Sequence, residues 1–122
     1  PARVAPPTLS SNKDKGQYGE HISDAYMRAQ GHTKLNDKGV LAPLPPTPAR
    51  GTGIDGVWQH HSPPPDFIVV EAKYGSSQLG NTRDGKQMSD TWIRGRNRLK
   101  KAVDDDVVAN DIRRAMRRGR VE

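Results

Sequence analysis

The strongest strand pattern in the chain is the unbroken apolar run Phe67–Val70, in which most residues are β-branched. Pro63–Pro65 precede the run and exclude a helix there, and Gly75 lies shortly after it. The pattern predicts a buried strand. Glu71 and Lys73 follow the run, and because side chains alternate along a strand, they should share one face. Charges are costly to bury without a partner or a metal ion, so this strand end is a candidate for chemistry.

A second strand is predicted over Gly53–Trp58, shortly before the first. Only residues 59–65 separate the two strands, which favours antiparallel neighbours. This pairing would bring Asp55 close to Glu71 and Lys73. The sheet is expected to be small, or to take a further strand from a segment that reads as a loop. The remaining strand candidates are two short apolar pairs, Val40-Leu41 and Val107-Val108.

Helical spacing of apolar residues predicts a first helix over Lys15–Gln30, with Gly31 after its end. Glu20 lies off its apolar stripe, and periodicity by itself predicts a solvated carboxylate at this position. The residues of the stripe are Tyr18, Ile22, Ala25, Tyr26 and Ala29.

Two more helices are predicted in the C-terminal half of the chain. One covers Lys86–Val103, and Trp92 is expected in the core on its apolar side, together with Met88, Leu99 and Val103. The other follows the acidic residues 104–106, which can cap it. Its apolar side consists of Val108, Ile112, Ala115 and Met116.

The chain divides into a short linker and one domain. Residues 1–14 carry prolines and little apolar pattern, and are expected to connect the domain to an upstream region. The first residue is Pro1 rather than methionine, as expected for part of a longer protein. Residues 15–122 are expected to form a domain of the α/β (α+β) class, with a small central sheet flanked by helices and an arginine-rich helix at its C-terminal end.

Composition points to a thin core and a polyanionic partner. Of the 122 residues, 32% are hydrophobic. A formal net charge of +6 and a pI near 9.9 favour nucleic acid or an acidic protein as partner, with solubility as the alternative role of the charge. Cysteine is absent, which excludes disulfides and thiolate metal sites. No apolar run approaches the ~20 residues that span a bilayer, and no secretory signal is visible.

Basic residues of the two C-terminal helices are the expected contacts to nucleic-acid phosphates. They are Arg94, Arg96, Arg98, Lys100, Lys101, Arg113, Arg114 and Arg117. A solvated helix face is the structural alternative for this set.

The charged residues at the strand end suit phosphodiester hydrolysis, which needs an activated water, charge neutralisation at phosphorus and help for the leaving oxygen. Mg²⁺ can serve all three needs and prefers oxygen ligands. Asp55, Glu71 and the carbonyl of Ala72 could supply such ligands. Lys73 could orient the attacking water or stabilise developing negative charge. Two side chains from the helices are candidates to complete the pocket: Glu20 and Gln87.

The same residues also have structural interpretations. Asp55 before Gly56 is a common turn signal. Glu71 and Lys73 can form an ordinary ion pair at a sheet edge. Gln87 can be an ordinary helix residue.

The histidines give a weaker signal than the carboxylates. His60-His61 can bind a metal ion or act as a general base, but adjacent histidines in a proline-rich loop are usually solvated. His21 and His32 lack ligand spacing and are left out of the predicted site.

An ordered set of residues resembles the PD-(D/E)xK nuclease superfamily, which has the restriction-endonuclease-like fold. The set consists of Glu20, Asp55, Glu71-Ala72-Lys73 at the end of a hydrophobic strand, and Gln87. The stretch Lys15–Glu20 is similar to the first helix of members that use an additional helical glutamate. Such members include nucleases that resemble Holliday-junction resolvases and nuclease toxins at the C-termini of bacterial polymorphic toxins. The resemblance covers residues 15–99.

This resemblance implies a central mixed sheet flanked by helices, Mg²⁺ or Mn²⁺ as cofactor, and cleavage of DNA. It implies that Asp55 and Glu71 bind the metal ion, with support from Glu20. Lys73 would act on the water, and Gln87 would position Lys73 or the substrate. The role of Glu20 differs from the one that periodicity favours, and the usual core of four strands exceeds the two that the pattern predicts clearly.

The expected function is therefore that of a metal-dependent DNA endonuclease. Cleavage should be largely non-specific, because contacts to the phosphate backbone carry little sequence information. The resemblance further implies the toxin domain of an antibacterial secreted effector, delivered by upstream domains of the same polypeptide, for example through type VI secretion. It would act in the target-cell cytoplasm, and an immunity protein with an acidic face would protect the producer. The alternatives are a repair or junction-resolving nuclease of the same fold and a non-catalytic basic module that binds nucleic acid.

Overall fold

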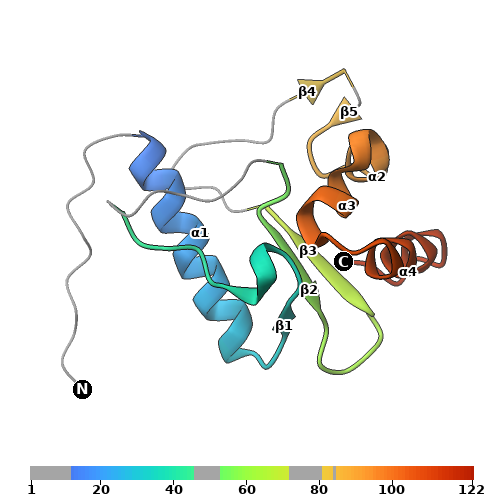
Figure 1. The fold of residues 1–122 in the computed structure, drawn as a ribbon, viewed down its shortest axis with the longest axis horizontal. Coiled ribbons are helices and arrows are strands. Elements are labelled where there is room, and N and C mark those ends of the chain that lie inside the picture. Colours follow the sequence, from blue (N-terminus) through green and yellow to red (C-terminus); the bar gives the residue numbers. More distant parts are fainter. Residues whose placement is uncertain (1–11, 46–52, 72–80, 84) are drawn as a thin grey trace.

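The computed structural model describes residues 12–45, 53–71, 81–83 and 85–122 (Figure 1). These residues form a small α+β domain built around a three-stranded antiparallel sheet of order β1-β2-β3. A separate two-stranded pair, β4-β5, precedes the C-terminal helices. In chain order the elements are α1 (Asn12–Ala29), β1 (Thr33–Lys34), the 3-10 turn η1 (Asp37–Gly39), β2 (Gly56–Gln59), β3 (Phe67–Val70), β4 (Asn81–Thr82), β5 (Gly85–Lys86), α2 (Asp90–Arg94), the 3-10 turn η2 (Gly95–Asn97), α3 (Arg98–Val103) and α4 (Asp106–Arg117).

The central hairpin confirms the two predicted strands and their antiparallel pairing. β2 and β3 pair from Gly56↔Val70 to Gln59↔Phe67. The third strand is β1, which pairs Thr33 with Gln59 and comes from a segment without a strand pattern. The two weaker candidates are wrong, because Val40-Leu41 is not in a strand and Val107-Val108 lies in the first turn of α4.

The C-terminal residues add a parallel partner to the free edge of β3. Val121 forms a parallel bridge with Phe67, and Glu122 donates its N–H to the Phe67 carbonyl over 3.0 Å. Nε of Arg120 donates to both carboxylate oxygens of Asp66 at 2.9 Å, which holds the C-terminal residues beside the start of β3. The same hydrogen bond lowers the pKa of Asp66. Among the described residues, the sheet is thus mixed only through this isolated bridge.

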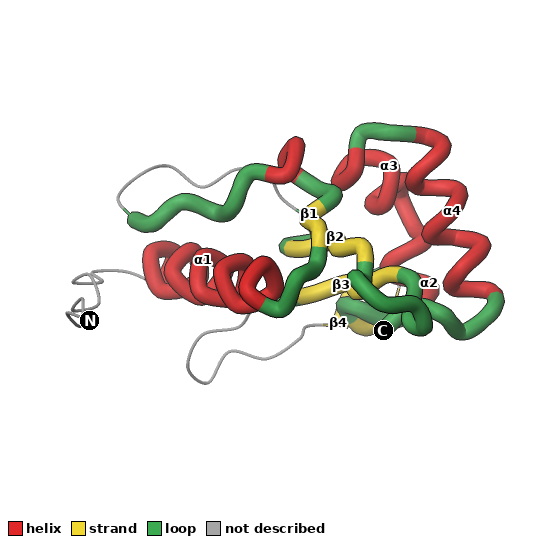
Figure 2. Tube along the Cα trace, turned by 90° about the horizontal axis from the view of Figure 1, so that it is seen from below, coloured by secondary structure: helices red, strands yellow, loops and turns green. Residues whose placement is uncertain are grey.

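Helices lie on both sides of the sheet, as Figures 1 and 2 show: α1 on one side, and α2, α3 and α4 on the other. The main apolar core lies on the second side, where Val57 and Val69 pack with Trp92, Leu99 and Ile112. Trp92 is therefore in the core, as predicted. Because side chains alternate along a strand, Trp58 next to Val57 turns to the opposite side and is itself fully buried.

Gly56 makes room for the Trp58 ring. A Cβ at this position would lie 2.9 Å from Trp58 Nε1 and 3.4 Å from the Val70 side chain. The residue is buried within β2, so the Asp55-Gly56 pair marks the start of a strand with a close contact rather than an exposed turn.

The predicted helix Lys86–Val103 is wrong as one element. It consists of the end of β5, a turn, α2, η2 and α3. The break falls at Arg96 and Asn97, whose φ angles of 53° and 57° are left-handed and incompatible with a continuous helix. The last predicted helix is confirmed: Asp105 caps α4 by accepting the N–H groups of Val107 and Val108.

The first helix is confirmed, but its buried face is not the predicted one. α1 begins at Asn12, earlier than predicted, and residues 1–11 of the expected linker lie outside the described residues. Two members of the predicted apolar stripe, Ile22 and Tyr26, are 49% and 62% exposed. Gln17 and Asp24 are 5% and 3% exposed instead. The helix therefore turns a largely polar face inwards.

Candidate functional site

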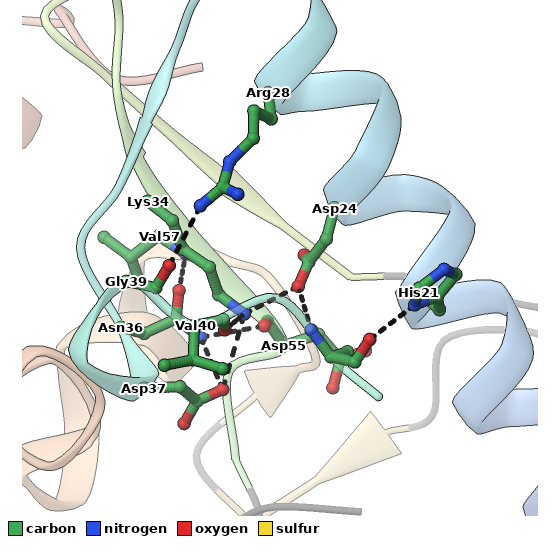
Figure 3. Close-up of polar contacts among 11 residues, drawn as sticks. His21, Asp24, Arg28, Lys34, Asn36, Asp37, Gly39, Val40, Asp55 and Val57 are labelled. Atoms are coloured by element: carbon green, nitrogen blue, oxygen red, sulfur yellow. Dashed lines mark hydrogen bonds and ion pairs between the residues drawn. The ribbon is translucent and has the colours of Figure 1, made fainter. Parts of the chain in front are cut away.

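Hydrogen bonds to an extended segment of the chain explain the orientation of α1. Asp24 Oδ2 accepts the Ala42 N–H at 2.7 Å and the Lys34 ammonium at 2.6 Å (Figure 3). His21 Nδ1 contacts the Ala42 carbonyl at 2.6 Å, and Gln17 Nε2 donates to the Pro43 carbonyl over 3.1 Å. Buried polar groups of the helix and of the segment thus satisfy one another.

Lys34 is the cation at the centre of this polar contact. Its ammonium also donates to the Val40 carbonyl at 2.8 Å and lies 3.6 Å from Asp37 Oδ2. The side chains of Lys34 and Asp24 are only 1% and 5% exposed. A buried pair of this kind depends on both partners, so it links α1 firmly to β1 and η1.

The polar orientation of α1 brings Glu20 to the end of the sheet. Glu20 lies on the helix three residues after Gln17 and four before Asp24, so the three share one face. At this end of the sheet, Glu20 forms a side-chain hydrogen bond with Asp55 and interacts electrostatically with the carboxylate of Glu71. Glu20 is therefore half-buried and hydrogen-bonded, not the solvated carboxylate that periodicity predicts.

Strand pairing places Asp55 and Glu71 next to each other. Gly56 at the start of β2 pairs with Val70 at the end of β3. Asp55 precedes Gly56 and Glu71 follows Val70, so the two residues are the next opposite positions beyond this pair. Oε2 of Glu71 is buried. Three carboxyl groups from α1, from the start of β2 and from the end of β3 consequently converge at one end of the sheet.

Asn36 holds the backbone around Asp55. Its Nδ2 donates to the Asp55 carbonyl at 2.9 Å, and its Oδ1 accepts the Val57 N–H at 3.0 Å (Figure 3). Only 2% of Asn36 is exposed. The sequence analysis did not identify this residue. An asparagine beside a short strand is the one local feature that could have indicated the role of Asn36. Its partners lie about twenty residues away in the sequence, so they leave no local pattern.

Burial and the neighbouring carboxyl groups raise the pKa of Glu20 from 4.5 to about 8. Burial is the largest cause, followed by the negative charge of Asp55, a hydrogen bond to Asp55, and the charges of Glu71 and Asp24. The folded domain thus favours the protonated form of Glu20 more than an exposed glutamate would. Carboxylate oxygens are ligands that a hard divalent cation such as Mg²⁺ or Mn²⁺ prefers, so these residues could hold such an ion.

Replacing Glu20 with glutamine should flatten the pH dependence of stability of the metal-free domain. The folded-state pKa lies above the unfolded one, so between 4.5 and about 8 the folded state binds more protons. Stability of the parent should therefore fall as pH rises through this range. We expect urea unfolding in EDTA to give a smaller loss of unfolding free energy between about pH 5 and pH 8 for Glu20→Gln than for the parent. Equal losses in both proteins would contradict the assigned cause.

Two residues of the predicted site are not placed by the structure relative to the carboxyl cluster. Lys73, like Ala72, lies outside the described residues. Gln87 is half-buried in the turn between β5 and α2, not on a helix as predicted. The roles of Lys73 and Gln87 stay predictions.

Some of the predicted phosphate-contacting residues have partners within the protein, and Arg113 donates to Asn110 Oδ1 over 2.9 Å. Arg98 is half-buried, with its guanidinium 4.5 Å from the Trp92 ring centroid and a hydrogen bond of 2.6 Å to the Trp92 carbonyl, so it helps to hold α2 and α3 together. Lys100 lies 3.1 Å from Asp106, and Arg114 pairs with Asp111 on α4. The members whose side chains lie exposed on the surface are Arg94, Arg96, Lys101, Arg114 and Arg117.

The structure also gathers histidines that the sequence analysis kept apart. His32 lies beside His60 and His61, and the potential ligand atoms of the three rings are all within 4.8 Å of one another. His32 was left out of the predicted site because its spacing to the pair is long. The pairing of β1 with β2 creates the cluster.

Comparisons of the chain with protein-family models, with curated proteins and with solved structures gave no match. Among the described residues, none of the helices has the length and hydropathy needed to cross a membrane.

Proposed function

We propose that this domain is a metal-dependent nuclease of the restriction-endonuclease-like type that hydrolyses phosphodiester bonds in DNA. The observation that carries the proposal is the convergence of Glu20, Asp55 and Glu71 from three separate elements at one end of the sheet. Each of these residues belongs to the set that the family resemblance identified.

The order of the elements supports the same proposal. A helix that carries a carboxylate precedes an antiparallel hairpin, with Asp55 before its first strand and Glu71 after its second. Helices follow, and the C-terminal residues return as a parallel partner of β3. This isolated bridge beside β3 is the feature that would take the place of the fourth strand in the mixed sheet of the family.

In the proposed mechanism, Asp55 and Glu71 would hold a Mg²⁺ or Mn²⁺ ion, with Glu20 as a third carboxylate. When bound, the ion supplies a lower pKa for the attacking water and charge neutralisation at phosphorus. Lys73 would orient that water and stabilise negative charge on the phosphate oxygens. Gln87 would position Lys73 or the substrate. Asn36 would keep Asp55 in place through the two hydrogen bonds to its neighbouring backbone.

DNA would bind through its phosphates, which explains the basic character of the chain. The net charge is +6, and exposed arginines and lysines lie on α2, η2, α3 and α4. Because these contacts do not read bases, cleavage would be largely non-specific.

The family resemblance extends the proposal to a biological setting. The domain would be the DNase toxin of an antibacterial secreted effector, delivered into the target-cell cytoplasm by upstream domains of its polypeptide. A cognate immunity protein with an acidic face would protect the producing cell, because such a face complements the basic surface.

The experiment that tests the nuclease proposal compares metal dependence with DNA binding. Supercoiled plasmid is incubated with the domain in Mg²⁺, in Mn²⁺ or in EDTA, beside a Lys73→Ala variant, and binding to a DNA duplex is followed in EDTA. We expect cleavage by the parent in either metal ion only, and a large loss of cleavage with nearly unchanged binding for Lys73→Ala. Binding without cleavage under all conditions would favour a non-catalytic nucleic-acid-binding module. A single-stranded RNA is incubated in parallel, and cleavage of this RNA without cleavage of the plasmid would overturn DNA as substrate.

A further inference from the structure

A cluster of three imidazoles lies at the other end of β2 from the carboxyl groups. Thr33 of β1 pairs with Gln59 of β2, so His32 and His60 are the next opposite positions beyond this pair. Gly31 has a φ of +91°, a left-handed conformation that glycine adopts readily, and a Cβ at this position would lie 3.8 Å from the His61 ring, an ordinary van der Waals contact. The fold thus assembles the cluster from the end of α1 and the hairpin loop.

We infer that His32, His60 and His61 form a binding site for a borderline divalent transition-metal ion such as Zn²⁺. The potential ligand atoms of the three residues lie within 4.8 Å of one another. Their ring centroids are separated by 4.4 Å (His32 to His60), 5.0 Å (His32 to His61) and 4.9 Å (His60 to His61). Zn–N bonds of about 2.0–2.1 Å place tetrahedral ligand nitrogens roughly 3.4 Å apart, so modest ring rotations would complete the coordination.

The chemistry of these ligands selects the kind of metal ion. Imidazole nitrogen suits Zn²⁺, Ni²⁺, Co²⁺ and Cu²⁺, whereas Mg²⁺ requires oxygen ligands. Burial and the neighbouring rings of His60 and His61 lower the pKa of His32, although Glu122 acts in the opposite direction. The lowered pKa favours the neutral ring that a metal ion needs. The two sites of this domain would therefore take different ions.

Current hydrogen bonds of the rings identify what would change on binding. His32 Nδ1 accepts the His61 N–H at 3.3 Å, and His60 Nδ1 accepts the Ser62 N–H at 2.9 Å. A neutral ring that accepts at Nδ1 carries its proton on Nε2. Coordination at Nδ1 would use the lone pair that accepts the N–H, and coordination at Nε2 would move the proton to Nδ1, which could then no longer accept. In both cases these contacts would be replaced by metal bonds. The amide groups of His61 and Ser62 should therefore report directly on metal binding.

Position in the fold indicates a structural role for the ion. Asp55 and His60 flank the four residues of β2, and five steps of about 3.3 Å per residue put the backbones of the two sites about 17 Å apart. A metal ion on the histidines would connect the end of α1 to the β2–β3 loop without touching the carboxyl groups. Three protein ligands would leave a coordination position for water or for a side chain of a partner molecule.

The test is a titration of the metal-free domain with ZnCl₂, followed by calorimetry, thermal unfolding and amide NMR. The parent should bind one Zn²⁺ per chain, unfold at a higher temperature when loaded, and shift the His61 and Ser62 amide signals. His32→Ala and His60→Ala should each weaken binding by more than about 10-fold, judged with far-UV circular dichroism to verify folding.

Two controls separate this site from other sources of binding. His21→Ala removes the one histidine outside the cluster and should retain Zn²⁺ binding, as should Glu71→Gln, which changes the carboxyl site. The inference is overturned if the parent shows no saturable binding of Zn²⁺, if the double variant His32→Ala/His60→Ala binds as tightly as the parent, or if Glu71→Gln abolishes binding. None of these outcomes depends on whether the domain cleaves DNA.

Discussion

Replacing Glu71 with glutamine should lower Mg²⁺-dependent DNA cleavage by at least about 10²-fold, the usual effect of losing one group that acts on charge in the transition state. Glutamine keeps the shape of the side chain but removes the charge that, with Asp55, would hold the metal ion. The same loss is expected for Asp55→Asn. Rates of plasmid nicking at saturating DNA measure the effect, and thermal unfolding in EDTA checks that each variant is folded.

A matched control comes from an acidic residue outside the carboxyl cluster. Asp90 is exposed in the first turn of α2, and Asp90→Asn makes the same chemical change there. We expect this variant to cleave DNA at a rate close to that of the parent. Equal rates for Glu71→Gln and Asp90→Asn would remove the carboxyl cluster from the mechanism.

Replacing Lys34 with methionine should lower the unfolding free energy by about 3–5 kcal/mol, because it leaves the buried Asp24 carboxylate without its cation. The two groups are 2.6 Å apart, with side chains 1% and 5% exposed. The Val40 carbonyl would lose a donor as well. Loss of this size is a large share of the ~5–15 kcal/mol typical of a domain, and urea unfolding measures it directly.

Two further variants separate charge burial from general damage. Lys34→Met combined with Asp24→Asn removes both charges and keeps an oxygen for the Ala42 N–H, so it should recover part of the lost stability. Lys100→Met breaks a solvent-exposed pair with Asp106, whose side chains are 39% and 79% exposed, and should cost less than about 1 kcal/mol. A cost for Lys34→Met as small as that for Lys100→Met would mean that the buried pair does not hold α1 in place.

Elements with a strong local pattern were predictable. The apolar run Phe67–Val70 forms β3, and the second strand pairs with it antiparallel. α4 starts where Asp105 can cap it, and Ile112 and Met116 are buried as their spacing predicted. In each case the interactions that decide the structure lie within a few residues, so the sequence displays them directly.

The orientation of α1 could not be predicted from periodicity. Ile22 and Tyr26 form the more apolar face, yet Gln17 and Asp24 are buried. The partners of the polar face are Lys34 and the backbone of residues 42–43, which lie in another part of the chain. A hydrophobic pattern contains no information about such distant hydrogen-bond partners.

By itself, the sequence determined the β2–β3 hairpin and therefore the neighbourhood of Asp55 and Glu71, because turn residues and strand patterns specify antiparallel pairing locally. Only the tertiary structure decided that Glu20 joins them and that His32 meets His60 and His61. The position of Glu20 depends on the buried Lys34–Asp24 ion pair, which fixes the orientation of α1. The histidine cluster depends on the pairing of the two-residue strand β1 with β2. Both are contacts between segments far apart in the chain, whose stability comes from burial and hydrogen bonding that exist only after folding.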